Sequence, residues 1–211
     1  MISLPQFQAY AEQGYNRIPI VREVLSDLDT PLSVYLKLAD GPNTYLFESV
    51  EGGETWGRYS IIGLPAKRRF VFRGNTCQEQ VLGETISTEQ LADPLAHVDA
   101  LRLRFKVPQI AELPDFSGGL VGYFGFETIA WIEPKLLPST KPDSLNVPDA
   151  LLLLSEEIAV FDSLKGRLYF IVHADPAEPQ AYVKAQRRLD ELVYRLRQSG
   201  SSYPDVLHPS C

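Results

Sequence analysis

Residues 46–60 include three side chains whose chemistry suits a free amino acid. A carboxylate and a hydroxyl, Glu48 and Ser49, precede a glycine-rich turn, and the guanidinium of Arg58 follows it. A carboxylate binds an α-ammonium group, a guanidinium or backbone N–H groups bind an α-carboxylate, and apolar walls hold a side chain. A hairpin that brings these groups together would supply the parts of an amino-acid site.

The spacing predicts such a β-hairpin. Strand-like runs at 44–50 and 55–62 flank a turn with two adjacent glycines. In a regular strand Glu48 and Ser49 face opposite sides. Both reach one ligand only if the strand is bulged there or one of them contributes its backbone. The alternative is a surface ion pair between Glu48 and Arg58 across the hairpin, worth about 0.2–1 kcal/mol.

The other candidate groups favour structural roles. The glycines of segment 118–126 could cradle an anion, but no lysine or arginine flanks them, which favours close packing of a strand. Glu156 and Glu157 are adjacent in a strand-like run and point to opposite faces, so we expect them to be solvated or locally paired. His97 and His173 are expected to have packing or surface roles.

The sequence contains no motif of a known catalytic machinery. A phosphate loop, a GxGxxG segment that opens a helix after a strand, HExxH and GxSxG are all absent from the 211 residues. The three histidines are far apart and have no partner ligands at metal-binding spacing. We therefore assign no catalytic residue and no metal ligand to this chain.

Composition and charge disfavour several classes of protein. With 45% hydrophobic and 22% charged residues, the composition is that of a globular protein. The net charge of −7 argues against a nucleic-acid or membrane partner, and the basic run 67–69 is expected to be a solvated strand end. Cys77 and Cys211 cannot form a disulfide framework, which favours a reducing, cytoplasmic compartment. Neither a signal peptide nor an apolar run of roughly 18 residues is present.

The first part of the chain predicts a helix followed by strands. A short helix is expected over 5–14, whereas 16–25 is ambiguous because Pro19 interrupts it, and 30–40 fits either a strand or a short helix. Four consecutive strand-like runs then predict a largely antiparallel meander, over 44–50, 55–62, 67–73 and 76–82.

Two Asp-Pro pairs, Asp93-Pro94 and Asp175-Pro176, predict helix starts in the second part of the chain. The second helix is expected to end near Gly200, with an apolar face that runs from Ala181 to Leu196. Between the two helices, 150–161 and 167–173 have the apolar composition of strands.

These elements predict an α+β fold, a mostly antiparallel sheet with helices packed on one side. We expect residues 1–198 to form one structured region. The polar, proline-containing segment 199–211 is expected to be a linker or a disordered tail.

Four segments, in a fixed order, resemble a known family. They are GYNRIP at 14–19, TPLSVYLKL at 30–38, LFESV at 46–50 with WGRYSIIG at 56–63, and GGLVGYFG at 118–125. Together they resemble the amino-terminal region of anthranilate synthase component I, a family of chorismate-utilising enzymes. The resemblance extends from about Gly14 to about Arg197.

The resemblance implies an activity for the complete enzyme. Members of the family convert chorismate and ammonia to anthranilate and pyruvate, at the first committed step of tryptophan synthesis. They use Mg²⁺, and a glutamine amidotransferase subunit, component II, supplies the ammonia. Tryptophan inhibits the enzyme from a site in component I that is separate from the active site.

The resemblance also implies site residues. An L-L-E-S segment forms part of the family's tryptophan site, and here it reads Leu46, Phe47, Glu48, Ser49, with Phe47 in place of the usual leucine. We add Arg58 from the hairpin geometry. The family's chorismate site, its Mg²⁺-binding glutamates and the rest of its tryptophan site lie in a C-terminal half that we expect this chain to lack. The chain alone is therefore expected to be inactive.

Three alternatives remain at this point. The amino-terminal part of aminodeoxychorismate synthase component I is the nearest, although the GYNRIP-type start and the pairing of LxES with WGRYS favour anthranilate synthase. A stand-alone amino-acid-binding module is the second. The third is a non-functional truncation product whose exposed former interface promotes aggregation.

Overall fold

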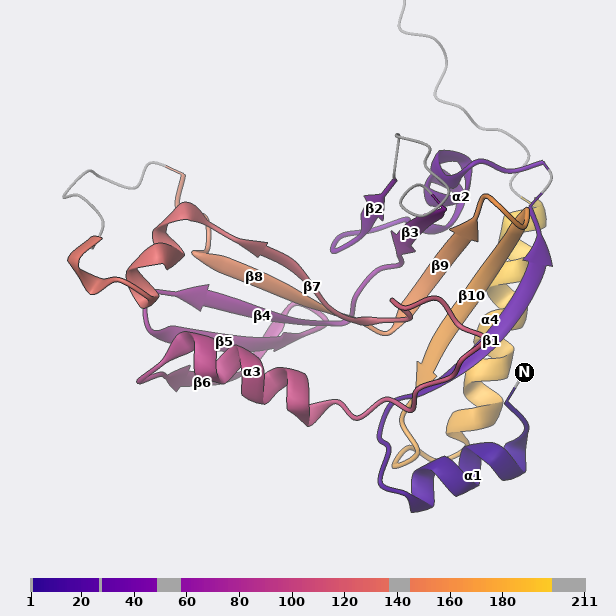
Figure 1. Cartoon of the computed structure of the whole chain (residues 1–211), viewed down its shortest axis with the longest axis horizontal. Helices are drawn as coiled ribbons and strands as arrows, with labels where there is room; N and C mark the ends of the chain where they lie inside the picture. Colours follow the sequence, from indigo (N-terminus) through magenta and orange to yellow (C-terminus); the bar gives the residue numbers. More distant parts are fainter. Residues whose placement is uncertain (1, 27, 49–57, 137–144, 199–211) are drawn as a thin grey trace, which may run out of the picture.

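The computed structural model describes residues 2–26, 28–48, 58–136 and 145–198, which build two five-stranded antiparallel sheets (Figure 1). Sheet A consists, in spatial order, of β1 (Ile18–Leu25), β10 (Arg167–Ala174), β9 (Glu157–Asp162), β3 (Tyr59–Gly63) and β2 (Tyr45–Phe47). Sheet B consists of β6 (Glu84–Gln90), β5 (Thr76–Val81), β4 (Arg68–Arg73), β8 (Ala150–Ser155) and β7 (Gly119–Phe124). The expected α+β class is confirmed.

Helices cover one face of sheet A. They are α1 (Leu4–Glu12), α2 (Pro31–Leu38) and α4 (Ala181–Gln198). Leu189 and Leu192 of α4 are fully buried in the core that these helices share with the sheet. On the opposite face, the segment that precedes β7 crosses the sheet (Figure 1), and its Leu113 and Phe116 pack against a cluster that contains Ile171. The expectation of helices on one side of a sheet is met here.

Sheet B has its own core under α3 (Pro94–Arg104). Leu101 of this helix packs in a cluster with Phe70 and Phe72 of β4. The Asp93 side chain accepts hydrogen bonds from the first helical N–H groups at 2.9 and 3.0 Å, so the predicted cap is confirmed. Two short 3₁₀ helices follow β7, η1 (Phe126–Trp131) and η2 (Pro134–Leu136).

The structure resolves two ambiguous segments. Residues 18–25 form β1 despite Pro19, because β1 is an edge strand of sheet A and the missing N–H costs little at an edge. Residues 31–38 form a helix. Thr30 and Ser33 make a capping box at its start, in which each side chain accepts the backbone N–H of the other.

The predicted single meander is wrong. The runs 44–50 and 55–62 contribute β2 and β3 to sheet A, whereas 67–73 and 76–82 contribute β4 and β5 to sheet B. β3 pairs with β9, with Ile61 opposite Val160, and β4 pairs with β8, with Phe70 opposite Leu152. In a meander, β3 and β4 would pair with each other. Here β9 lies beside β3 and β8 lies beside β4, and both come much later in the sequence.

The apolar run 150–161 also divides between the sheets. β8 ends in sheet B at Ser155, and β9 begins in sheet A at Glu157. Glu156 lies between the two strands. The acidic interruption in this run thus marks the point at which the chain passes from one sheet to the other.

The second predicted helix start is wrong. α4 begins at Ala181, and the Asp175 carboxylate instead accepts the N–H of Ala177 at 2.9 Å within a turn. An Asp-Pro pair suits a turn as well as a helix cap, so the local signal was not specific. The apolar face of the helix is as predicted, with Ala181, Ala185 and Leu196 buried.

None of the helices in the described ranges is long and apolar enough to cross a membrane. The predicted tail, 199–211, lies outside the described residues.

Candidate functional site

The predicted hairpin is present as the pair β2 and β3. These strands are antiparallel, with Tyr45 opposite Gly63 and Phe47 opposite Ile61. Residues 49–57, which connect the two strands in the sequence and include Ser49, lie outside the described residues. The two strands that would position the predicted tryptophan-binding segment are therefore in place.

The three described residues of that segment, 46–48, have different surroundings. Leu46 lies opposite Ile62 and packs, partly buried, against the core that sheet A shares with its helices. Glu48 directly follows β2, and its side chain is exposed. Phe47 between them is 52% exposed, and its ring centroid lies 5.0 Å from that of Tyr45. Leu46 thus anchors the hairpin, while Glu48 is free to meet a ligand.

Arg58 is held by Asp162 at the end of β9. Its Nε and an Nη nitrogen donate to the two carboxylate oxygens at 2.9 and 2.6 Å, a bidentate geometry. Asp162 is 1% exposed and also accepts the backbone N–H groups of Leu164 and Lys165, at 3.1 Å each. Arg58 pairs with Asp162 and not with Glu48, so the alternative of a surface ion pair across the hairpin is wrong.

The charge of Asp162 is stabilised where it lies. Burial by itself would raise the pKa of this carboxyl, but the hydrogen bond from Arg58 and the N–H of Lys165 hold the pKa below its usual value of 3.8. Because a buried acceptor competes better for a guanidinium than a solvated one, Arg58 pairs with Asp162. A ligand at the hairpin could use only the N–H groups of Arg58 that Asp162 leaves free.

Tyr45 connects the hairpin to the other sheet. Its hydroxyl lies 2.7 Å from the hydroxyl of Ser155, the last residue of β8 in sheet B. The ring lies over Gly63, where a Cβ atom would come within 2.0 Å of it. Burial raises the pKa of Tyr45 to about 12, so the phenol stays protonated. Sequence reasoning missed this residue, because its partner is 110 positions away.

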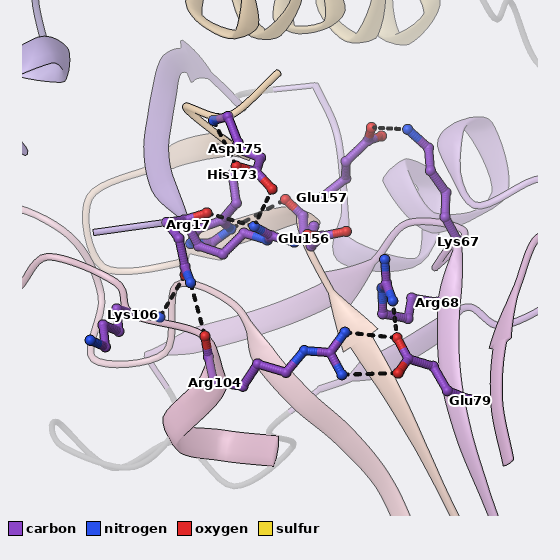
Figure 2. Close-up of polar contacts among 12 residues, drawn as sticks. Arg17, Lys67, Arg68, Glu79, Arg104, Lys106, Glu156, Glu157, His173 and Asp175 are labelled. Atoms are coloured by element: carbon purple, nitrogen blue, oxygen red, sulfur yellow. Dashed lines mark hydrogen bonds and ion pairs between the residues drawn. The ribbon is translucent and has the colours of Figure 1, made fainter. Parts of the chain in front are cut away.

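A cleft of about 1000 Å³ lies where the two sheets meet, and we call it the junction cleft. Its walls come from the start of β1, the connection from β3 into β4, the end of β10 and the first turns of α4. Figure 2 shows some of the charged side chains that line it, among them Arg17, Lys67 and Glu156. This cleft could not be predicted from the sequence, because its walls belong to segments far apart in the chain.

Arg17 links three parts of the chain that are far apart in the sequence (Figure 2). Its Nε donates to Glu156 at 2.6 Å, and an Nη nitrogen donates to Asp175 at 2.7 Å. Only 13% of the Arg17 side chain is exposed, so both pairs are partly shielded from water. The start of β1 is thereby linked to the crossing point between the sheets and to the end of β10.

The network continues from sheet A to sheet B through Phe105. The guanidinium carbons of Arg17 and Arg104 each lie 5.3 Å from the centroid of this ring. Arg104 also binds both carboxylate oxygens of Glu79 at 2.9 Å, and Arg68 pairs with the same carboxylate. Cation–π contacts and ion pairs therefore run without a break from Glu156 to β5.

His173 has a packing role, as expected. Its Nδ1 lies 3.2 Å from the carbonyl oxygen of Glu156, and a carbonyl only accepts, so Nδ1 carries the proton. Its Nε2 is buried and has no partner among the described residues. Burial, with a smaller contribution from the charge of Arg17, lowers the pKa of His173 to about 4, although the hydrogen bond to the Glu156 carbonyl opposes the shift.

The glycine-rich segment serves close packing, which confirms the favoured interpretation. A Cβ atom on Gly118 would lie 2.4 Å from Cε1 of His173. On Gly122 it would lie 1.8 Å from the carbonyl oxygen of Leu151 in the neighbouring strand. Neither position has room for a side chain.

Glu157 is locally paired, as expected for this acidic pair. Arg188 of α4 donates to it at 2.8 Å, and Nζ of Lys67 lies 3.8 Å from its other oxygen. In the described ranges no three His, Cys, Asp or Glu side chains gather closely enough to hold a metal ion. The described residues therefore do not fit a Mg²⁺ site.

Fold and site together define an α+β domain of two cross-linked antiparallel sheets. A solved structure of anthranilate synthase component I from Streptococcus pneumoniae shares this fold, with a TM-score of 0.54 and 23% sequence identity. The superposition covers 84% of this chain and 37% of that one. No family model matches the sequence.

Curated relatives give a more specific assignment. The chain is 52% identical over 202 residues to anthranilate synthase component 1 of Neisseria meningitidis, which covers 94% of the chain and 41% of the relative. It is 51% identical over 195 residues to the protein of the same name from Pseudomonas aeruginosa, covering 92% and 39%. The resemblance to the anthranilate synthase component 1 family is confirmed: the chain is a relative of the amino-terminal part of these proteins, and it spans about 40% of their length.

Proposed function

We propose that this chain is the amino-terminal, regulatory part of an anthranilate synthase component I. The complete enzyme would convert chorismate and ammonia to anthranilate and pyruvate in the cytoplasm, as a carbon–oxygen lyase of tryptophan biosynthesis. Its hairpin, with Leu46 in β2, Glu48 directly after this strand and Ser49 next in the sequence, would contribute part of a site for tryptophan as a feedback inhibitor.

The observation that carries this proposal is the identity of about 50% to proteins named anthranilate synthase component 1 over almost the whole chain. The same names disfavour the aminodeoxychorismate synthase alternative. The hairpin adds physical support, because β2 and β3 present an exposed carboxylate, Glu48, beside the segment that contains Ser49.

Further components of the complete enzyme follow from the same proposal. A glutamine amidotransferase subunit would supply ammonia, and chorismate and Mg²⁺ would bind in a part of the polypeptide that has no counterpart here. When bound, Mg²⁺ would stabilise negative charge on the substrate. The described residues offer no place for it, and no step of the regulation below depends on it.

The regulation we propose is a two-state equilibrium. Tryptophan at the hairpin would favour an arrangement of component I that turns over chorismate poorly. The hairpin is well placed to transmit such a change, because β3 pairs with β9 and Tyr45 bonds to Ser155 of sheet B. Coupling of this kind typically amounts to about 1–3 kcal/mol, and chorismate must weaken tryptophan binding by the same factor.

Ser49→Phe in the complete enzyme tests the site. We expect a large rise in the tryptophan concentration needed for half-inhibition, with turnover in the absence of tryptophan largely unchanged. Thr88→Phe makes an equally large change at an exposed position of β6 in the other sheet, and it should leave inhibition as it was. An unchanged inhibition constant in Ser49→Phe would remove the hairpin from the site.

Calorimetry on the 211-residue chain separates a partial site from an independent sensor. We expect no measurable heat from tryptophan, because the rest of the family's site lies outside this segment. Micromolar binding would instead support a stand-alone amino-acid-binding module. In the same preparation we expect no ammonium-dependent anthranilate fluorescence, and its appearance would overturn the view that this segment lacks the catalytic part.

A further inference from the structure

The junction cleft carries an excess of positive charge in an acidic protein. Six basic residues line it: Arg17, Lys67, Arg68, Arg69, Lys184 and Arg188. Four acidic residues line it: Glu156, Glu157, Asp175 and Glu178. Within the lining itself the basic residues exceed the acidic ones by two, whereas the whole chain has a net charge of −7. Two carboxylates outside the lining, Glu79 and Glu191, pair with Arg68 and Arg188. A concave surface that concentrates one sign of charge attracts ligands of the opposite sign.

Two of the basic groups are committed to the protein itself. Arg17 is 13% exposed and bound to two carboxylates at 2.6 and 2.7 Å. Arg68 pairs with Glu79, which also binds Arg104. These ion pairs hold the walls of the cleft together, and their charges are neutralised.

On the β4 side of the cleft, two cations have weak or neutral partners. Lys67 is 66% exposed, and its distance of 3.8 Å from Glu157 is longer than a hydrogen bond. The guanidinium of Arg69 donates to the amide oxygens of Gln80 at 2.7 Å and Asn43 at 3.3 Å, both neutral. Both cations can therefore bind an anion without leaving a protein carboxylate unpaired.

The α4 side faces them with one weakly held cation. Lys184 is 58% exposed, and its pair with Glu178 at 3.4 Å is exposed as well, so it is easily displaced. Arg188 lines the same cleft, but it is bound to the carboxylates of Glu157 and Glu191 at 2.8 Å each, so it serves the protein itself. The first turn of α4 contains no acidic residue, so the positive end of the helix dipole adds to these charges.

We propose that the junction cleft binds a small polyanion, a di- or tricarboxylate or a phosphate ester, between Lys67 and Arg69 on one side and Lys184 on the other. A cleft of about 1000 Å³ accommodates a metabolite of this kind. The site is separate from the hairpin: none of Leu46, Glu48 and Arg58 lines the cleft. This inference does not depend on the proposed function.

Occupancy would also act on the structure, because the three cations belong to different sheets. Lys67 directly precedes β4 of sheet B and Arg69 lies in it, whereas Lys184 lies on the helix that covers sheet A. A ligand that contacts both sides fixes one sheet relative to the other. We therefore expect binding to slow amide exchange on both sides of the cleft.

The test is a titration of the full chain with citrate and with inorganic phosphate at low ionic strength, followed by NMR or calorimetry. Chloride at matched ionic strength is the blank. We expect saturable binding by one of the two probes, with shifts at both walls of the cleft. Saturation by citrate alone assigns the site to carboxylates, and saturation by phosphate alone assigns it to phosphates.

Charge-removing variants test the location. Lys67→Gln combined with Lys184→Gln should weaken binding about tenfold or more, because both exposed cations of the cleft are lost. Lys165→Gln removes an exposed lysine in the turn between β9 and β10, away from the cleft, and should leave the affinity unchanged. The proposal is overturned if neither probe saturates, or if Lys165→Gln weakens binding as much as the double variant.

Discussion

The Nε atom of Arg17 lies 2.6 Å from a carboxylate oxygen of Glu156, although 139 residues separate the two in the sequence. Glu156 marks the point where the chain leaves sheet B for sheet A, and Arg17 stands at the start of β1 in sheet A. The same guanidinium reaches Asp175 at the end of β10. One side chain thus fixes the crossing point between the sheets.

Arg17→Met should destabilise the protein by about 2–3 kcal/mol, because it leaves Glu156 and Asp175 without their cation in a partly buried place. Urea unfolding measures the loss. Arg102→Met is the matched control, since Arg102 and its partner Asp99 are each 72% exposed and 3.7 Å apart. The control should change stability by less than about 0.5 kcal/mol. Equal losses in the two variants would contradict the structural role of Arg17.

His173 should make stability depend on pH in the mildly acidic range. Its pKa is lowered from 6.5 to about 4 by burial, so between these values the unfolded chain binds a proton that the folded chain does not. Stability is therefore fully present above about pH 6.5 and falls by about 2–3 kcal/mol as the pH drops toward 4. His173→Asn, which can still donate to Glu156, should flatten this slope. An NMR titration midpoint of the ring near its usual value would contradict the assignment.

Asp162 should make stability depend on pH in a more acidic range than His173 does. Its pKa is held below 3.8, so its contribution is present above that value and is lost as the pH falls through the lower folded-state pKa. Asp162→Asn should cost stability near neutral pH, and the difference from the unchanged protein should shrink as the pH falls below 3.8. Asp99→Asn, at a 72% exposed position, serves as the control with little effect at either pH.

Gly122→Ala should cost about 3 kcal/mol or more, because its Cβ atom would lie 1.8 Å from the backbone oxygen of Leu151 and the strands must separate. Gly74→Ala is the control, because it tests the effect of the backbone conformation without a steric contact. Gly74 has φ +52° and nothing within 4 Å of a new Cβ atom, so only the conformational cost of about 1–2 kcal/mol applies. Similar urea midpoints for the two variants would argue against close packing at β7.

Much of the local structure could be predicted from the sequence. The Asp93 cap, the hairpin of β2 and β3, and the buried face of α4 depend on residues close together in the chain, and all three are confirmed. β6 was not expected over 84–90, because its residues are almost all exposed and show no apolar alternation. The tip of the hairpin, with Ser49, remains a prediction.

The sequence alone determined the family, the α+β class and the elements whose signals lie within a few residues of one another. Only the tertiary structure decided that β3 and β4 belong to different sheets, that Arg58 pairs with Asp162 instead of Glu48, and that a basic cleft lies between the sheets. Each of these depends on contacts between residues about 80 to more than 100 positions apart, such as Arg58 with Asp162. Local propensity carries no information on such pairings. They are selected by the burial of apolar faces and of charged partners, which takes place only when the chain is compact.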